Sequence, residues 1–275
     1  MRLILLLALG SLVSLQGVSQ RRGDEPFQLR EKLPLGHSMM ECIYEYKVYD
    51  PLRDESREYF YILEMDKDLS RYSNYGTYML DSIIATDYPD GLTNREYDIV
   101  AKGIKRRTLD EMVKYPSEST MEVYDNVFMD YYVYADSVKD MNWRLMPETK
   151  VVCGNVCHRA EITYRGRNWT AWYCDIPRSD GPWKFGNLPG LILSVEDDKG
   201  EHVFKAVAIR KSDRDFGRRD RWNIKTTREK YNKSLKEYKE NPIDFMKGSP
   251  YAPKDANGNI PKPVGRMFYN AIELD

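Results

Sequence analysis

Several features are scarce in this sequence of 275 residues. After residue 19 it has no hydrophobic run long enough to cross a bilayer, for which about 20 residues are needed. The 42 basic and 43 acidic residues nearly balance, so nucleic acid is not an expected partner. There are only three histidines and four cysteines, and the sequence has no phosphate-binding Gly-rich loop and no nucleophile elbow. We therefore expect a non-enzymatic protein without a cofactor.

The first nineteen residues are the exception to this lack of hydrophobic runs. Arg2 is followed by LILLLALGSLVSL, and Gly17 and Ser19 have the spacing that signal peptidase prefers. We predict a signal peptide over residues 1–19, cleaved after Ser19. The remainder, residues 20–275, is then a single exported domain that is not transmembrane once the signal is removed.

Export would place the four cysteines in an oxidising compartment, where cysteine pairs form disulfides. A two-residue turn at Arg165-Gly166, with Gly166 at positive φ, aligns residues whose numbers add to 331. Cys157 then faces Cys174 at a non-hydrogen-bonded pair, where the Cα atoms of two strands come closest. We predict a Cys157–Cys174 disulfide and, by subtraction, a Cys42–Cys153 disulfide.

Metal binding is the alternative use of these cysteines. The segments CGNVCH (153–158) and HSMMEC (37–42) combine thiolate, thioether and imidazole groups, which suit Cu(I) or Zn. Their spacing matches no standard zinc motif. A metal-handling function would need at least three of these groups to converge at bonding distance; the candidates are Cys153, Cys157, His158, Met39, Met40 and Cys42.

Alternation of hydrophobic and polar residues predicts about eight to ten short strands, joined mostly by hairpins. The predicted strands lie in residues 39–50, 57–66, 120–128, 131–136, 143–149, 157–174 and 190–210. Helices are predicted over residues 94–107, capped by Asn94, and 226–241, with a Thr226–Glu229 capping box. The second helix belongs to a helical and Pro/Gly-rich C-terminal extension from about residue 222. We expect a mainly β (α+β) fold, a curved antiparallel sheet or open half-barrel with a few peripheral helices.

The stretch GPWKFGNLPGLIL, residues 181–193, interrupts the strands. Leu188-Pro189-Gly190-Leu191 suits a type II turn, which would place Gly190 at positive φ. The sixteen-residue connection from Asp175 to Gly190 is rich in aromatic residues, and loops of this length are usually functional or disordered. Either its apolar side chains plug one end of the sheet, or the loop lines a cavity mouth or docks a partner. The residues concerned are Trp183, Phe185, Asn187, Leu188, Pro189 and Gly190.

The segment AWYCDIPRSDGPWKFGNLPGLIL resembles the signature of the GLPGLI family of exported Gram-negative envelope proteins, with Asn187 in place of the first Gly. The similarity extends to CHRAEITYRGRNWTAWY, and more loosely to residues 59–83 and the closing YNAIEL. It implies export to the periplasm or cell surface of a Gram-negative bacterium, and no established activity or catalytic residue. Any positive φ at Asn187 must be adopted by asparagine, which tolerates it.

These observations predict an envelope protein that binds a hydrophobic ligand or an outer-membrane protein partner, with metal handling as the alternative. An apolar cavity beneath Trp183 would favour ligand binding. A fully packed sheet interior would leave partner docking.

Overall fold

The computed structural model describes residues 23–51, 53–105, 110–247 and 267–275, with positions 249, 252, 254 and 258. The predicted signal peptide, residues 1–19, lies outside this part of the chain. The chain divides into two compact units. We call Met1–Glu31 with Gly76–Arg106 the helical unit, and Lys32–Tyr75 with Arg107–Asp275 the sheet unit.

The helical unit is built around α2 (Tyr75–Asp87) and α3 (Asn94–Lys102). Helix α3 begins after Thr93, whose side chain forms a capping box with Glu96. The cap therefore lies one residue before the predicted Asn94, because the Thr93 hydroxyl, and not the Asn94 side chain, accepts the Glu96 amide. A small buried cluster of Leu80, Ile84 and Leu92 holds the two helices together.

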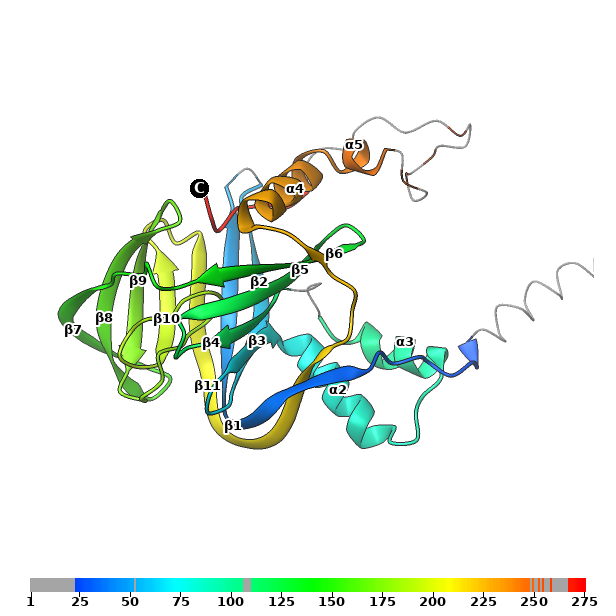
Figure 1. The fold of residues 1–275 in the computed structure, drawn as a ribbon, viewed down its shortest axis with the longest axis horizontal. Helices are drawn as coiled ribbons and strands as arrows, with labels where there is room; N and C mark the ends of the chain where they lie inside the picture. Colours follow the sequence, from blue (N-terminus) through cyan, green and yellow to red (C-terminus); the bar gives the residue numbers. More distant parts are fainter. Residues whose placement is uncertain are drawn as a thin grey trace, which may run out of the picture. The chain divides into compact units, whose positions relative to one another are not determined.

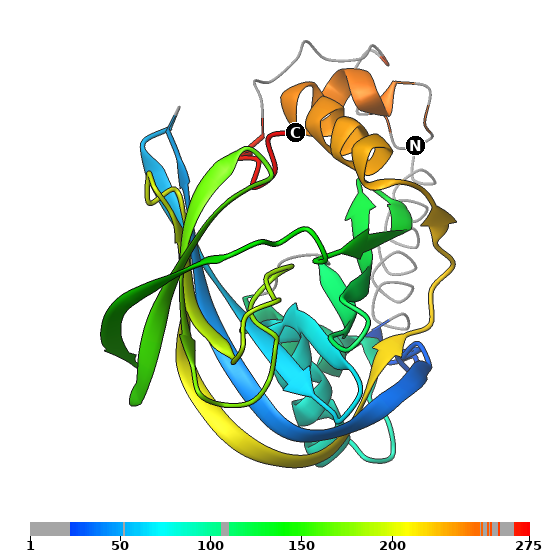
Figure 2. The ribbon, with the colours of Figure 1, turned by 60° about the vertical axis from the view of Figure 1, so that its left-hand side comes forward.

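The sheet unit contains one large, open sheet, which confirms the predicted fold class. In the part of the chain that the structure describes, the strands follow the order β12-β6-β5-β4-β3-β2-β1-β11-β10-β9-β8-β7. Neighbours are antiparallel except β6 and β12, which run parallel. The sheet curves into a half-barrel with β12 and β7 at its two ends (Figures 1 and 2). The strands are β1 (Lys32–Asp50), β2 (Glu55–Met65), β3 (Ser70–Asn74), β4 (Glu111–Tyr115), β5 (Thr120–Val127), β6 (Asp130–Ser137), β7 (Arg144–Val152), β8 (Asn155–Tyr164), β9 (Arg167–Cys174), β10 (Ile192–Asp197), β11 (His202–Arg219) and β12 (Ile224–Lys225).

The hairpin of β8 and β9 has the predicted turn and register. Arg165 and Gly166 both adopt positive φ, 53° and 75°, as a two-residue turn requires. The aligned pairs run from Tyr164 with Arg167 to Cys157 with Cys174. The predicted apolar face is the one that packs into the core, as Ala160, Trp169 and Ala171 are almost completely buried.

The predicted disulfides are absent from the structure, where all four cysteines are free thiols. Correct register is not sufficient, because a disulfide also requires the two side chains to point at each other. The Cys157 thiol instead donates toward the Asn155 carbonyl oxygen on its own strand, at 3.5 Å. Cys153 lies at positive φ in the β7–β8 turn, and Cys42 is buried in the middle of β1.

Two helices follow the sheet, α4 (Arg228–Glu240) and α5 (Pro242–Met246). The cap of α4 is Thr227, whose hydroxyl accepts from the Lys230 amide, so the cap lies one residue after the predicted Thr226 and the predicted Thr226–Glu229 pairing is wrong. Figure 2 shows α4 above the open side of the half-barrel, beside the C-terminus. Of the described helices, none has both the length and the hydrophobicity to cross a membrane.

Candidate functional site

A cavity of about 610 Å³ lies within the sheet unit. Its walls come from the concave side of the sheet, the loop at Trp183, helix α4 and the chain's last residues. Twelve of its 29 lining residues are aromatic and eight of these are tyrosines. Small-molecule sites usually have volumes of about 300–1,000 Å³, with mainly hydrophobic walls and a few polar groups. The sheet interior is therefore not fully packed, and its open space has the size of a ligand pocket.

Aromatic rings from four adjacent strands form one wall of the cavity. Tyr46 of β1 lies opposite Phe204 of β11 in the register, and their rings stack with centroids 4.3 Å apart and an angle of 6°. Tyr61 of β2 and Tyr72 of β3 stack at 4.9 Å and 4°. Cross-strand aromatic pairs stabilise a sheet, and these four almost completely buried rings form a tightly packed wall of the cavity.

Several tyrosine hydroxyls of the cavity are engaged within its walls. Tyr61 donates to Asp110 at 2.9 Å, and Tyr231 of α4 donates to Asp125 at 2.5 Å. The Tyr46 hydroxyl hydrogen-bonds with His202 Nδ1 at 2.8 Å. These three hydroxyls therefore already have hydrogen-bond partners within the protein.

The Gly/Pro-rich loop combines both roles that the sequence left open. Trp183 lines the cavity, whereas Phe185 and Leu188 are buried in the core. The Phe185 ring packs edge-on against Trp169 of β9 at 4.8 Å. Asn187 is exposed, adopts φ 62° and donates to the Met141 carbonyl at 2.9 Å, so asparagine does take the positive φ expected of it. Pro189 is exposed, and nothing in the structure assigns it to a site.

Gly190 is needed for a reason other than the predicted one. Its φ is not positive, so the type II turn expected at this position is wrong. A Cβ at residue 190 would lie 1.8 Å from the Cys174 carbonyl oxygen, which only glycine avoids. The close approach of two backbone segments, and not turn geometry, selects this glycine.

A buried ion pair anchors the loop to the sheet. Asp180 lies 3.0 Å from the Lys114 ammonium of β4 and also accepts from the Ser70 hydroxyl of β3. Lys114 donates in addition to the Gly181 carbonyl at 2.6 Å. Burial lowers the pKa of Lys114, and the attraction of Asp180 opposes this shift only in part. This network lies outside the cavity lining, so it fixes the loop that carries Trp183 without contacting a ligand.

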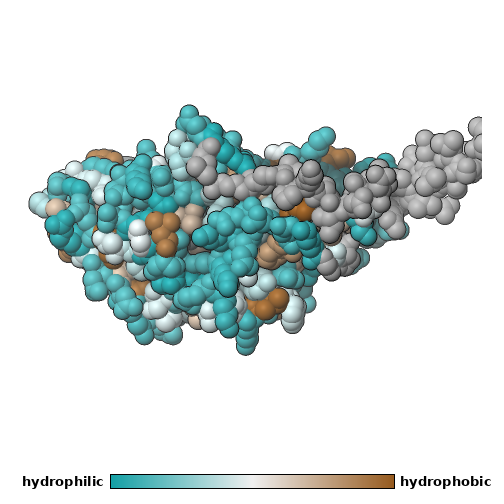
Figure 3. All heavy atoms as spheres, turned by 90° about the horizontal axis from the view of Figure 1, so that it is seen from above, coloured by the Kyte–Doolittle hydropathy of each residue, from teal (hydrophilic) through white to brown (hydrophobic). Residues whose placement is uncertain are grey.

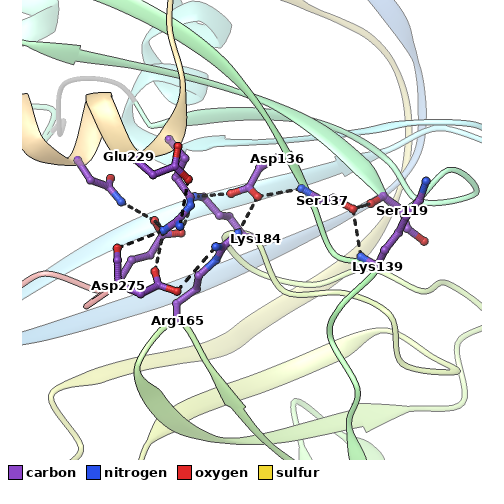
Figure 4. Close-up of polar contacts among 11 residues, drawn as sticks. Ser119, Asp136, Ser137, Lys139, Arg165, Lys184, Glu229 and Asp275 are labelled. Carbon is purple, nitrogen blue, oxygen red and sulfur yellow. Dashed lines mark hydrogen bonds and ion pairs between the residues drawn. The ribbon is translucent and has the colours of Figure 1, made fainter.

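A second charged cluster lies at the edge of the cavity, where four elements converge (Figure 4). Lys184 follows Trp183 in the loop, is 2 % exposed, and contacts Asp136 of β6 at 2.8 Å and Glu273 at 2.5 Å. Its ammonium also lies 5.0 Å from the centroid of the Tyr134 ring. Burial disfavours the charged form, but Tyr134, Glu273 and Asp136 outweigh burial, so the pKa of Lys184 is raised.

No clear sequence pattern marks this cluster. The available signals were a lone lysine between two aromatic residues in GPWKFG and the closing YNAIEL of the family resemblance. Neither indicates that the two segments meet, because the contact spans 89 residues of sequence.

The groups suggested for metal binding do not form a site. Among the residues that the structure describes, no three His, Cys, Asp or Glu side chains are placed to hold one metal ion. The convergence that a metal-handling function would require at Cys153, Cys157 and His158 is therefore not found in this part of the chain. The face drawn in Figure 3 is mainly hydrophilic, with hydrophobic residues scattered over it.

No protein-family model matches the sequence, and no curated protein matches it. Among solved structures, PNGF-II in space group P21 is similar, with a TM-score of 0.46, 13% identity, and coverage of 74% of this chain and 34% of that one. PNGF-II in space group C2 is similar to the same degree, with a TM-score of 0.46, 12% identity, and coverage of 74% of this chain and 33% of that one. The chain thus spans about a third of the length of these structures, and a likeness this weak carries no functional argument.

Proposed function

We propose that this is an exported envelope protein, similar to the GLPGLI family, that binds a small hydrophobic ligand in its aromatic cavity without catalysing a reaction. The observation that supports ligand binding is the 610 Å³ cavity beneath Trp183, lined by twelve aromatic residues. An apolar cavity at this place was the feature that distinguished ligand carriage from partner docking; the cavity found there is lined by charged residues as well, among them Asp110, Asp125 and Lys184. The export and the cell-envelope location rest on the N-terminal segment and the family resemblance alone.

The walls also suggest what kind of hydrophobic ligand fits. The twelve aromatic residues of the lining favour a planar or ring-containing molecule over a thin alkyl chain, because aromatic rings pack against one another with a specific geometry. Arg53 and Arg57 line the same cavity but are paired with Asp50 and Glu55, so they do not by themselves select an acidic ligand. The dye 1-anilinonaphthalene-8-sulfonate contains a planar naphthalene ring and is a suitable first probe.

The test is an isothermal titration of the full chain with this dye. We expect saturable binding of one dye per chain. Leu235 lines the cavity from α4 and is partly buried, so Leu235→Trp fills space that a ligand would occupy. We expect this substitution to weaken dye binding at least about tenfold, because little room remains beside the aromatic wall.

Leu145→Trp is the matched control, because Leu145 lies on β7, is 55 % exposed and is not part of the cavity lining. It should leave the affinity unchanged within about twofold. Circular dichroism establishes that both variants are folded. Equal affinities of Leu235→Trp and the parent chain would place the dye elsewhere and remove the support for this function.

A further inference from the structure

The last residues of the chain close the mouth of the cavity. We call Met267–Asp275 the strap; it has no regular secondary structure, and its first seven residues line the cavity. The strap adds no strand to the sheet. Its position is therefore set by individual contacts, which resemble those of a bound peptide more than those of a folded element.

One side chain of the strap, Asn270, is recognised at both ends of its amide. Its Oδ1 accepts from Arg167 at 2.9 Å. Its Nδ2 donates to the Tyr49 carbonyl at 2.6 Å and to Glu201 at 3.1 Å. The Arg167 side chain is 5 % exposed and pairs with Asp197 at 2.6 Å. The group that donates to Asn270 is therefore buried and held in place.

Glu273 is recognised by three side chains from the loop and α4. It contacts Lys184 at 2.5 Å, accepts from Asn232 at 2.7 Å, and lies 3.3 Å from Arg228. The Glu273 side chain is only 4 % exposed. Figure 4 shows its partner Lys184 directed toward Asp136 in the same cluster. Charge-assisted hydrogen bonds in such surroundings are stronger than those between neutral groups.

Backbone and apolar contacts complete the recognition. Arg167 donates to the Ala271 carbonyl at 2.6 Å, and the Leu274 amide donates to the Arg165 carbonyl at 3.0 Å. The Arg57 guanidinium lies 4.1 Å from the centroid of the Phe268 ring. A Cβ on Gly166 would come within 2.8 Å of Leu274, so the β8–β9 turn is shaped to admit the strap.

An empty groove would be electrostatically unfavourable. Without Glu273, the buried Lys184 would keep a single carboxylate partner, Asp136, which also pairs with Arg165. Arg228 would keep Glu229, which is 66 % exposed. Leaving a buried charge without its partner is strongly destabilising. Whatever replaces the strap must therefore bring its own acidic group.

We propose that this groove is a peptide-binding site that the strap occupies within its own chain, and that an acidic peptide segment of a partner protein replaces the strap there. The peptide that fits is extended, carries asparagine and glutamate three residues apart, and has an aromatic residue two positions before the asparagine. Two of the recognising side chains keep a buried partner without the strap, Arg167 with Asp197 and Lys184 with Asp136. The same hydrogen bonds to them can form again with another chain.

The strap competes with such a peptide at high effective concentration. It is joined to α5 by residues 248–266, and a short tether gives an effective concentration of about millimolar. A free peptide therefore binds the parent chain weakly, and binding becomes visible when the strap's own contacts are weakened.

The experiment uses the full chain carrying Asn270→Ala and Glu273→Gln. A fluorescein-labelled peptide, MFYNAIELD, which copies the strap, is titrated and its anisotropy measured. We expect it to bind this double variant at least about tenfold more tightly than the parent chain. The control peptide MFYAAIQLD should bind neither protein, and Glu237→Gln, an exposed change of equal charge on α4, should behave as the parent.

A second measurement covers the case that the double variant does not fold. Hydrogen exchange of the parent strap is followed by mass spectrometry with excess isotope-labelled MFYNAIELD. We expect faster exchange in Met267–Asp275, since the strap is displaced. Absence of binding to a folded variant, or unchanged exchange in the parent, would overturn the proposal.

Two further outcomes distinguish this proposal from strap exchange between two copies of the chain and from the proposed ligand function. Concentration-dependent dimers that exchange their straps would make a second copy of the chain the occupant and would overturn the partner assignment. Dye binding in the cavity without any peptide binding would leave the proposed ligand function intact and remove this one alone.

Discussion

At the scale of single residues, the buried polar groups determine how the stability of this protein depends on pH. His202 is completely buried between aromatic rings, and its ring nitrogen is bonded to the Tyr46 hydroxyl in the cavity wall. Burial, followed by the positive charge of Arg167, lowers the pKa of His202 to about 3 from its usual 6.5. The imidazole of the folded protein is therefore neutral at pH 7.

This shift predicts a loss of stability in mild acid. Below pH 6.5 the unfolded chain protonates His202, while the folded chain does so only near pH 3. The unfolded state therefore binds more protons in this window, and stability falls as the pH falls, by at most about 1.4 kcal/mol per pH unit. Urea unfolding at pH 7 and about pH 5.5 should show this loss.

In His202→Gln most of the loss should disappear, because glutamine does not titrate. The control is His37→Gln, since His37 is exposed and its pKa is raised by hydrogen bonds to Asp215 and Asp213. A raised pKa adds stability at low pH that is lost above 6.5, so this variant should keep the acid loss. An identical pH profile in the parent and His202→Gln would contradict the assignment.

At the scale of elements, the loop from Asp175 to Gly190 is a structural piece that also forms a cavity wall. Asp180 and Lys114 pin its middle, and Gly190 lets its end pass directly against the Cys174 backbone. The position of Trp183 in the cavity therefore depends on residues that do not themselves line the cavity.

Gly190→Ala tests this dependence. The new methyl group would overlap a backbone oxygen, which cannot move aside as a flexible side chain would. We expect a loss of at least about 2 kcal/mol in unfolding free energy together with weaker dye binding. Gly103→Ala is the control, since nothing lies within 4 Å of its added carbon and its φ of −83° suits alanine. Unfolding curves that coincide for the parent and Gly190→Ala would show that the loop is not held as described.

At the scale of the whole molecule, the chain contains two compact units with separate hydrophobic clusters. The helical unit depends on only a few buried side chains, of which Leu92 is one. Replacing a buried leucine by alanine costs about 2–5 kcal/mol. Leu92→Ala should therefore speed hydrogen exchange in residues 76–105 and leave exchange in the sheet, and dye binding, unchanged. Faster exchange across β1 and β11 would mean that the two units unfold together.

The sequence predicts the sheet better than the site, for a physical reason. Alternation and turn residues are local signals, so the register from Tyr164–Arg167 to Cys157–Cys174 follows from the Arg165-Gly166 turn alone. The predicted disulfides are absent because the register of two strands does not determine the direction in which their side chains point. The contacts of Lys184 with Glu273, and of Arg167 with Asn270, join segments about 90 to 100 residues apart, and no periodicity encodes such a meeting. The short strands β3 and β4 and helix α2 lay in a stretch without clear pattern.

The unclosed sheet has a consequence for solubility. Every open sheet presents unpaired backbone groups at its two outer strands, and these can recruit other chains into aggregates. Here one outer strand, β12, is only two residues long. The other, β7, contains Pro147, which has no amide hydrogen to donate, and the pairing with β8 is irregular between Leu145 and Thr149. The edge of the sheet at β7 is therefore a poor template for fibril growth, although the sheet does not close on itself.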